Sequence, residues 1–159
     1  MKKNIFIVVS SFISCIAGAG ITAKMYSTKT AKLEDNFQKM YEFYKILNKW
    51  LTLKQEGKSL KDYFLKNGYK SVAIYGMKEL GERLYDELKD TEIEVKYMID
   101  KNADNLYSEV TIVTPDGELE EVDVIVVTAV HYYEEIENML KNKIDYPILS
   151  MEDIVYEMS

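Results

Sequence analysis

Val72-Ala73-Ile74-Tyr75-Gly76-Met77-Lys78-Glu79-Leu80-Gly81 is the stretch that decides the fold of this chain. It begins with a short apolar run of β-forming residues, and that run meets a glycine directly. From Glu79 onward the apolar pattern changes, because Leu80, Leu84 and Leu88 recur on one face of a helix. The order of strand, tight turn and helix predicts the first unit of a parallel α/β sheet.

The residues around this unit repeat the alternation of strands and helices. Thr114-Pro115-Asp116-Gly117 has the chemistry of a turn, and Ser59 and Ser150 are placed to cap helices. Because crossovers between parallel strands are right-handed, we expect the strand order 3-2-1-4-5 and a ligand crevice at the carboxyl ends of the first and fourth strands. The expected strands are 72–75, 93–98, 110–113, 122–127 and 147–149, and the expected helices are 59–66, 79–88, 132–141 and 151–158.

The segment 4–23 carries no charged residue, and twenty helical residues match the roughly 30 Å hydrocarbon core of a bilayer. Three interpretations compete: a signal peptide cleaved near Ala17-Gly18-Ala19, a lipoprotein signal modified at Cys15, and an uncleaved transmembrane anchor. The apolar run continues past both candidate cleavage points. It therefore favours the uncleaved anchor.

Flanking charges bear on the orientation of this anchor. Lys2 and Lys3 precede it with the amino terminus, and more lysines follow it, which favours a cytoplasmic carboxyl-terminal domain. A nucleotide-binding fold also has its ligands in the cytoplasm. We thus expect a single-pass protein of a bacterial cell membrane. The formal charge of −7 argues against nucleic acid as a partner.

A heptad-like stripe follows the anchor, with apolar residues at alternating spacings of four and three. Two interpretations are open: a helix packed against its own domain, or a parallel dimer of anchored chains. Gly57 suits the end of this helix. The stripe consists of Leu33, Phe37, Met40, Tyr44, Leu47 and Leu51.

The predicted organisation has four parts, and its fold class is α/β. A basic N-terminus (1–3) and a transmembrane helix (4–23) precede an amphipathic, coiled-coil-like connecting helix (24–57). The remainder (58–159) is expected to form a Rossmann-like parallel sheet of four or five strands flanked by helices.

The glycine turn has the position of a dinucleotide-binding G-x-G-x-x-G motif, but Lys78 replaces its middle glycine. Lys78 could meet a phosphate through its ammonium, or the turn could be purely structural. Asp100, twenty-four residues after Gly76, is where an acid would bind a ribose hydroxyl, and it is equally suited to a turn. His131 is the only histidine and a weak catalytic candidate, since no carboxylate dyad, nucleophile elbow or metal-spaced cluster accompanies it.

The stretch from Leu51 to Glu157 resembles a known group of proteins. Its quoted motifs are Leu53-Lys54-Gln55-Glu56-Gly57-Lys58-Ser59-Leu60, Ile74-Tyr75-Gly76-Met77, Ile99-Asp100-Lys101 and Val124-Ile125-Val126-Val127-Thr128-Ala129. They are similar to the Rossmann-like, NAD(P)-binding-type modules of bacterial surface-polysaccharide biosynthesis, such as nucleoside-diphosphate-sugar epimerase/dehydratase-like proteins and the N-terminal domains of sugar O-acetyltransferases. The resemblance implies a crevice for a nucleotide, a nucleotide sugar or NAD(P). The residues expected to line it are Gly76, Met77, Lys78, Gly81, Asp100, Lys101 and Thr128.

Three functions follow from these features. The first is a non-catalytic, membrane-tethered accessory that binds a nucleotide or nucleotide sugar and has a partner in cell-surface glycan biosynthesis. The second is an NAD(P)-dependent, epimerase- or dehydratase-like enzyme, for which the sequence supplies few acid-base groups. The third is a ligand-free scaffold that dimerises or recruits a partner through the helix at 30–55.

Overall fold

The computed structural model describes residues 2–158, with side chains described from residue 26. It begins with helix α1 (Lys2–Gln55), and the predicted transmembrane anchor at 4–23 lies outside the described side chains. Within the part whose side chains are described, we find no helix that combines the length and the apolarity needed to cross a membrane. The chain divides into two compact units, Met1–Phe43 and Tyr44–Ser159, so that the last turns of α1 belong to the α/β unit.

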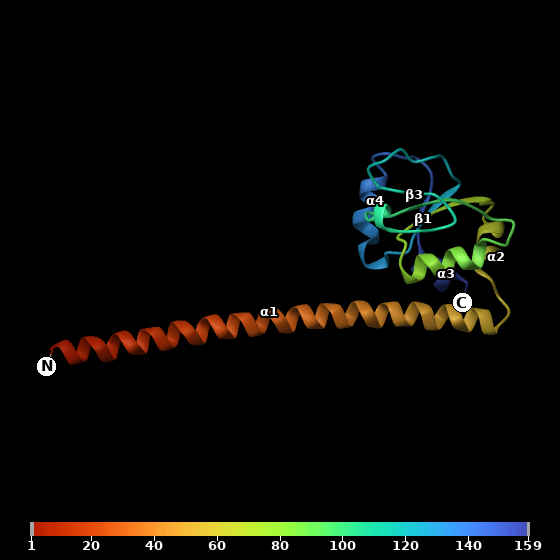
Figure 1. Cartoon of the computed structure of the whole chain (residues 1–159). Coiled ribbons are helices and arrows are strands. Elements are labelled where there is room, and N and C mark those ends of the chain that lie inside the picture. Colours follow the sequence, from red (N-terminus) through yellow and green to blue (C-terminus); the bar gives the residue numbers. More distant parts are fainter. Residues whose placement is uncertain (1, 159) are drawn as a thin grey trace. The chain divides into compact units, whose positions relative to one another are not determined.

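The second unit is built on a five-stranded sheet in the order β3-β2-β1-β4-β5 (Figure 1). Every adjacent pair of strands is parallel, which confirms the predicted α/β class and strand order. The strands are β1 (Ser71–Tyr75), β2 (Glu94–Ile99), β3 (Ile112–Val113), β4 (Val124–Val127) and β5 (Ile148–Ser150). The remaining helices are α2 (Leu60–Lys66), α3 (Glu79–Leu88), α4 (Tyr133–Leu140) and α5 (Met151–Glu157), with 3-10 turns η1 (Ala103–Asn105) and η2 (Val130–Tyr132).

The two faces of the sheet carry different helices. Ala73 and Tyr75 belong to one buried cluster together with Ile136 and Leu140 of α4. Side chains alternate along a strand, so Val72 and Ile74 point to the opposite face. That face is covered by α3, whose Leu84 and Leu88 are fully buried and lie outside the α4 cluster. The helices that follow β1 and β4 therefore lie on opposite sides of the sheet.

The ends of several elements differ from the sequence-based prediction, for local reasons. The third strand is shorter than expected, because Val110 N–H donates to the Ser108 hydroxyl instead of extending the strand. The fourth begins at Val124, because Asp123 is engaged with the start of β1. The predicted helix α3 matches the observed bounds. Ser150 also caps α5 as expected, accepting from Glu152 N–H at 3.2 Å.

Asp123 joins the amino ends of β1 and β4. Its Oδ2 accepts the backbone N–H groups of Lys70 and Ser71, each at 2.8 Å, and its own N–H donates to the Ser71 hydroxyl at 3.0 Å. These donors stabilise the ionised carboxylate and hold the pKa of Asp123 below its usual range. The interaction fixes the relative register of the two central strands.

We expect an acid-sensitive contribution to stability from Asp123. A carboxyl whose pKa is lowered by folding stabilises the native state above its ordinary pKa of 3.8, and this stabilisation is lost as the pH falls through the lower native pKa. Urea unfolding of the wild type and of Asp123→Asn should therefore differ near neutral pH and begin to converge as the pH falls below about 4. A difference that stays constant from pH 6 to pH 2.5 would contradict this role.

Candidate functional site: the carboxyl edge of β1 and β4

The candidate crevice lies at the carboxyl ends of β1 and β4. The chain leaves β1 toward α3 on one face of the sheet and leaves β4 toward α4 on the other. Such a point, where the strand order reverses, is where ligands bind in open parallel sheets. The structure brings the predicted residues Gly76 and Thr128 together at this point, 2.8 Å apart between the Thr128 hydroxyl and the Gly76 carbonyl oxygen.

Gly76 has a conformation that the turn requires. Its φ of +99° is one that side chains rarely adopt, and a Cβ there would stand 2.8 Å from the Thr128 hydroxyl oxygen. Gly76 N–H also donates to the Ile99 carbonyl at 2.8 Å, which ties the turn to β2. Thr128 is buried, and its hydroxyl contacts the carbonyls of both Tyr75 and Gly76. The turn is thus held from both neighbouring strands.

Gly81 allows the first turn of α3 to pack on the glycine turn. A Cβ at this position would collide with the carbonyl oxygen of Gly76 and approach its carbonyl carbon to 3.0 Å. Gly81 therefore has the role of the third glycine in a dinucleotide-binding turn, which is close packing of helix on strand. Gly76 and Gly81 keep the tight-turn and packing roles of that motif.

Asp100 reaches from the end of β2 into the glycine turn. Its Oδ2 accepts the backbone N–H of Met77 at 2.9 Å, and its Oδ1 accepts the N–H of Asn102 at 2.8 Å. The predicted residues Met77 and Asp100 are thus in direct contact, although Met77 contributes its backbone and buries its side chain. Each carboxylate oxygen has a second lone pair, which can still accept a ribose hydroxyl. The Met77 N–H already donates to Asp100, so it is not available to donate a hydrogen bond to a phosphate.

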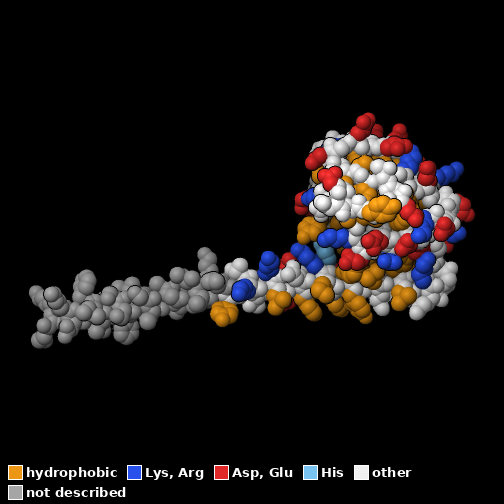
Figure 2. Space-filling view, in the orientation of Figure 1, with side chains coloured by type: hydrophobic (Ala, Val, Ile, Leu, Met, Phe, Trp, Pro, Cys, Tyr) orange, Lys and Arg blue, Asp and Glu red, His pale blue; other side chains and the backbone are white. Residues whose placement is uncertain are grey.

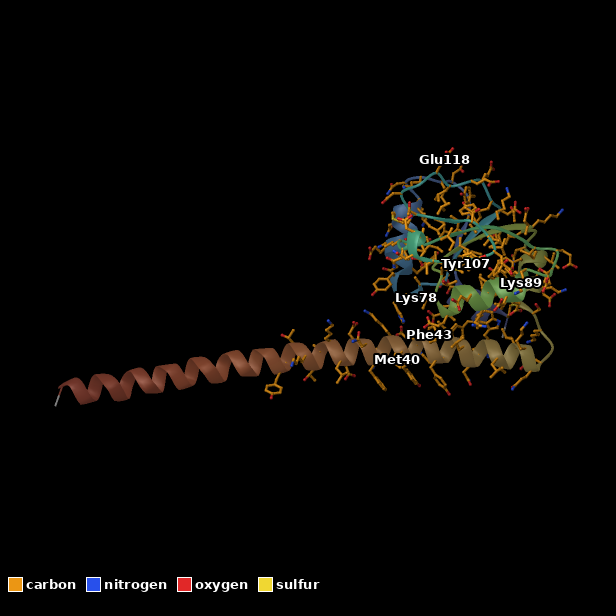
Figure 3. The ribbon with its side chains drawn as sticks, viewed as in Figure 1. Met40, Phe43, Lys78, Lys89, Tyr107 and Glu118 are labelled. Carbon is orange, nitrogen blue, oxygen red and sulfur yellow. The ribbon has the colours of Figure 1, made fainter. Side chains whose placement is uncertain are left out.

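Lys78 and Lys101 supply positive charge around the turn. Lys78 is the N-cap residue of α3, has an extended backbone and makes no side-chain cap hydrogen bond. Its side chain is exposed and stands out from the start of α3 (Figure 3). Lys101, which follows β2, is also exposed. The exposed Lys78 ammonium can therefore approach an anion beside the positive end of α3.

Tyr75 is a residue at this edge that the sequence alone did not single out. Its side chain is 4% exposed, and its hydroxyl is the buried side-chain polar atom that has no hydrogen-bond partner among the described residues. Burial raises the pKa of Tyr75, and the nearby carboxylates of Asp100 and Glu135 raise it further. A strand-end tyrosine in an apolar run gives no sequence signal that its hydroxyl is left unpaired.

His131 lies in η2, the turn that follows Thr128 and Ala129, and is half-buried. It lines a cavity of about 410 Å³ between the start of α4 and the start of α5, together with Tyr133 and Ser150. Burial and a hydrogen bond to Glu137 raise the pKa of Tyr133 to about 12. Four carboxylates also line this cavity and would repel a phosphate: Glu134, Glu135, Glu152 and Asp153. The cavity beside His131 is therefore not the nucleotide crevice expected from the sequence.

Among the residues with described side chains, no group of three or more potential metal ligands gathers. The polar groups at the crevice are instead suited to hydrogen bonding: the Thr128 hydroxyl, the Asp100 carboxylate and the Lys78 ammonium.

Comparison with known proteins gives one family match. A family model described as C2185-like, N-terminal, matches residues 68–149, which is just over half of the 159 residues. The matched segment contains β1, the glycine turn, α3, β2 and β4. No match was found among curated proteins or among solved structures.

Proposed function

The chain belongs to the C2185-like, N-terminal family, and we propose that the family segment, residues 68–149, binds a nucleotide or a nucleotide sugar at the carboxyl edge of β1 and β4. The observation that carries this proposal is the Gly76 turn. It has a positive φ, is held by Thr128 and Ile99, and lies where the strand order reverses.

In this proposal each crevice residue contacts a different part of the ligand. Lys78 neutralises phosphate charge at the start of α3, with the helix dipole adding to the attraction. The Lys78 side chain replaces the close backbone approach that the missing middle glycine would allow, because an ammonium can reach a phosphate at a longer distance from the backbone. Asp100 is held in place by Met77 and Asn102 and accepts a ribose hydroxyl with its remaining lone pairs.

The cellular role we propose is that of a non-catalytic accessory in bacterial cell-surface polysaccharide biosynthesis, anchored to the membrane through residues 4–23 with the α/β domain in the cytoplasm. Two features support it: the uncharged length of that segment, and the resemblance to modules of surface-polysaccharide biosynthesis.

Isothermal titration of the full-length protein in detergent against nucleotides, nucleotide sugars and NAD(P) tests the binding. We expect Lys78→Ala to weaken the best ligand about fivefold, since removing one exposed cation from a phosphate costs about 1 kcal/mol. The control is Lys89→Ala at the other end of α3, where Nζ pairs with Asp86 at 3.0 Å. It removes the same charge away from the crevice and should leave the affinity unchanged (Figure 3). No detectable binding of any ligand in the panel, or an equal loss of affinity in the two variants, would overturn the proposed site.

A further inference from the structure

Helix α1 presents two apolar faces along its carboxyl-terminal part. Ile46, Trp50 and Leu53 are buried in the core of the α/β unit, with exposed fractions of 6% or less. Within the same unit Tyr44 and Leu51 are 59% and 56% exposed, although they belong to the heptad-like stripe. The end of α1 thus packs against its own domain, which is one of the two predicted alternatives, but it does so through a face other than the one that carries Tyr44 and Leu51.

The exposed stripe continues toward the amino terminus of α1. Leu33, Phe37 and Met40 are 70%, 62% and 74% exposed, and Tyr26 extends the same spacing by a further heptad at 73%. Large apolar side chains gather on α1 in Figure 2, and their number in one row is more than an ordinary helix leaves in water. Written as a heptad, Phe37, Tyr44 and Leu51 take position a, and Leu33, Met40 and Leu47 take position d.

Charged residues avoid this stripe. Most of them occupy the outer heptad positions b, c and f, and Asp35 and Lys39 form an ion pair at 2.7 Å on that side of the helix. The outer residues are Lys32, Asp35, Lys39, Glu42, Lys45 and Lys49. The segregation matches a helix that pairs with another helix through the a and d positions.

Two charges do flank the stripe, and they select the orientation of the partner. Lys29 takes position g and Glu34 takes position e of the following heptad. In a parallel pair of identical helices, position g of one chain lies beside position e of the next heptad in the other, so Lys29 meets Glu34 twice. An antiparallel pair centred on the stripe would place Lys29 near the other end of the stripe, away from Glu34.

We propose that the exposed stripe of α1 is the seam of a parallel, in-register coiled coil with a second copy of this chain. The seam runs from Tyr26 to Leu51, and the Lys29 and Glu34 pairs fix its register. The face with Ile46, Trp50 and Leu53 stays on its own α/β unit, so each chain brings one crevice to the dimer. This proposal is independent of what that crevice binds.

A substitution in the seam tests it. Met40→Glu places a charge at position d, whereas Gln38→Glu places the same charge two residues away at an exposed outer position and serves as the matched control. In sedimentation equilibrium of the full-length protein in detergent, we expect Met40→Glu to raise the dimer dissociation constant at least tenfold and Gln38→Glu to leave it near the wild-type value. Equal dissociation constants for both variants, or a monomeric wild type, would overturn the proposal.

Charge exchange tests the parallel register. Lys29→Glu alone should weaken the dimer, because it brings two carboxylates together at each flank, and the double variant Lys29→Glu/Glu34→Lys should restore it. Residues 29 and 34 are five apart and do not face one another on one helix, so restoration can only arise between chains. Failure of the double variant to recover would exclude the parallel, in-register pair. Disulfide cross-linking in a Cys15→Ser background adds a direct readout: Met40→Cys should cross-link and Gln38→Cys should not, and the reverse result would overturn the seam.

Discussion

Replacing Gly81 by valine is expected to destabilise the α/β domain by about 3 kcal/mol or more, because the new side chain is driven into the backbone of the glycine turn. The obstacle is the Gly76 carbonyl, which cannot move without breaking its contact with Thr128. The change is best followed in urea by the fluorescence of Trp50, the only tryptophan, which is buried in this unit.

Glu82→Val is the matched control for this substitution. It introduces the same β-branched residue one position later in α3, at an exposed side chain, without the collision. Helix propensity alone would favour Gly81→Val over Glu82→Val, because valine forms helices better than glycine and less well than glutamate. Gly81→Val should unfold at a much lower urea concentration than Glu82→Val. Similar midpoints for the two variants would show that the first turn of α3 is not packed on the Gly76 turn.

Removing the carboxylate of Glu87 should destabilise the α/β domain by about as much as Gly81→Val does. This side chain is only 4% exposed and accepts the Trp50 indole N–H at 2.7 Å, the Leu60 backbone N–H at 2.7 Å and the Ser59 hydroxyl at 2.9 Å. It also pairs with Lys54 at 2.9 Å. Glu87→Ala leaves these donors without an acceptor in a buried setting, and we expect a loss of about 3 kcal/mol in the free energy of unfolding.

The same variant should change the surroundings of the indole. Because Trp50 loses its partner, its emission should shift to longer wavelength in the native state as the end of α1 becomes more hydrated. Glu82→Ala, at an exposed position of the same helix, should change neither the emission nor the unfolding midpoint. Glu87→Gln keeps one acceptor oxygen and should fall between the two. A native emission and stability equal to wild type in Glu87→Ala would contradict the role assigned to this carboxylate.

The central strands and α3 could be predicted from the sequence because their signals are local. Gly76 marks the turn where a strand pattern becomes a helix pattern, and the handedness of crossovers then determines the strand order. The start of the short strand β3 was predicted less accurately. The Ser108 hydroxyl accepts the Val110 N–H, so this N–H is not available to extend the strand.

The parts that could not be predicted depend on contacts between distant segments. That Asp100 would bind the Met77 amide follows only once the ends of β1 and β2 are side by side. Glu87 looks like any acid within a helix until the end of α1 is placed against it. The two apolar faces of α1 have similar spacing, so periodicity alone could not decide which one meets the domain.

The contacts of Glu87 also give α3 a mechanical role. The helix is about 15 Å long, with the glycine turn packed on its first turn and the last turns of α1 bonded to its final one. Short contacts make both attachments, so a change at one end of α3 is expected to disturb the packing at the other. Within the α/β unit, the glycine turn and the last turns of α1 are therefore attached to opposite ends of the same helix.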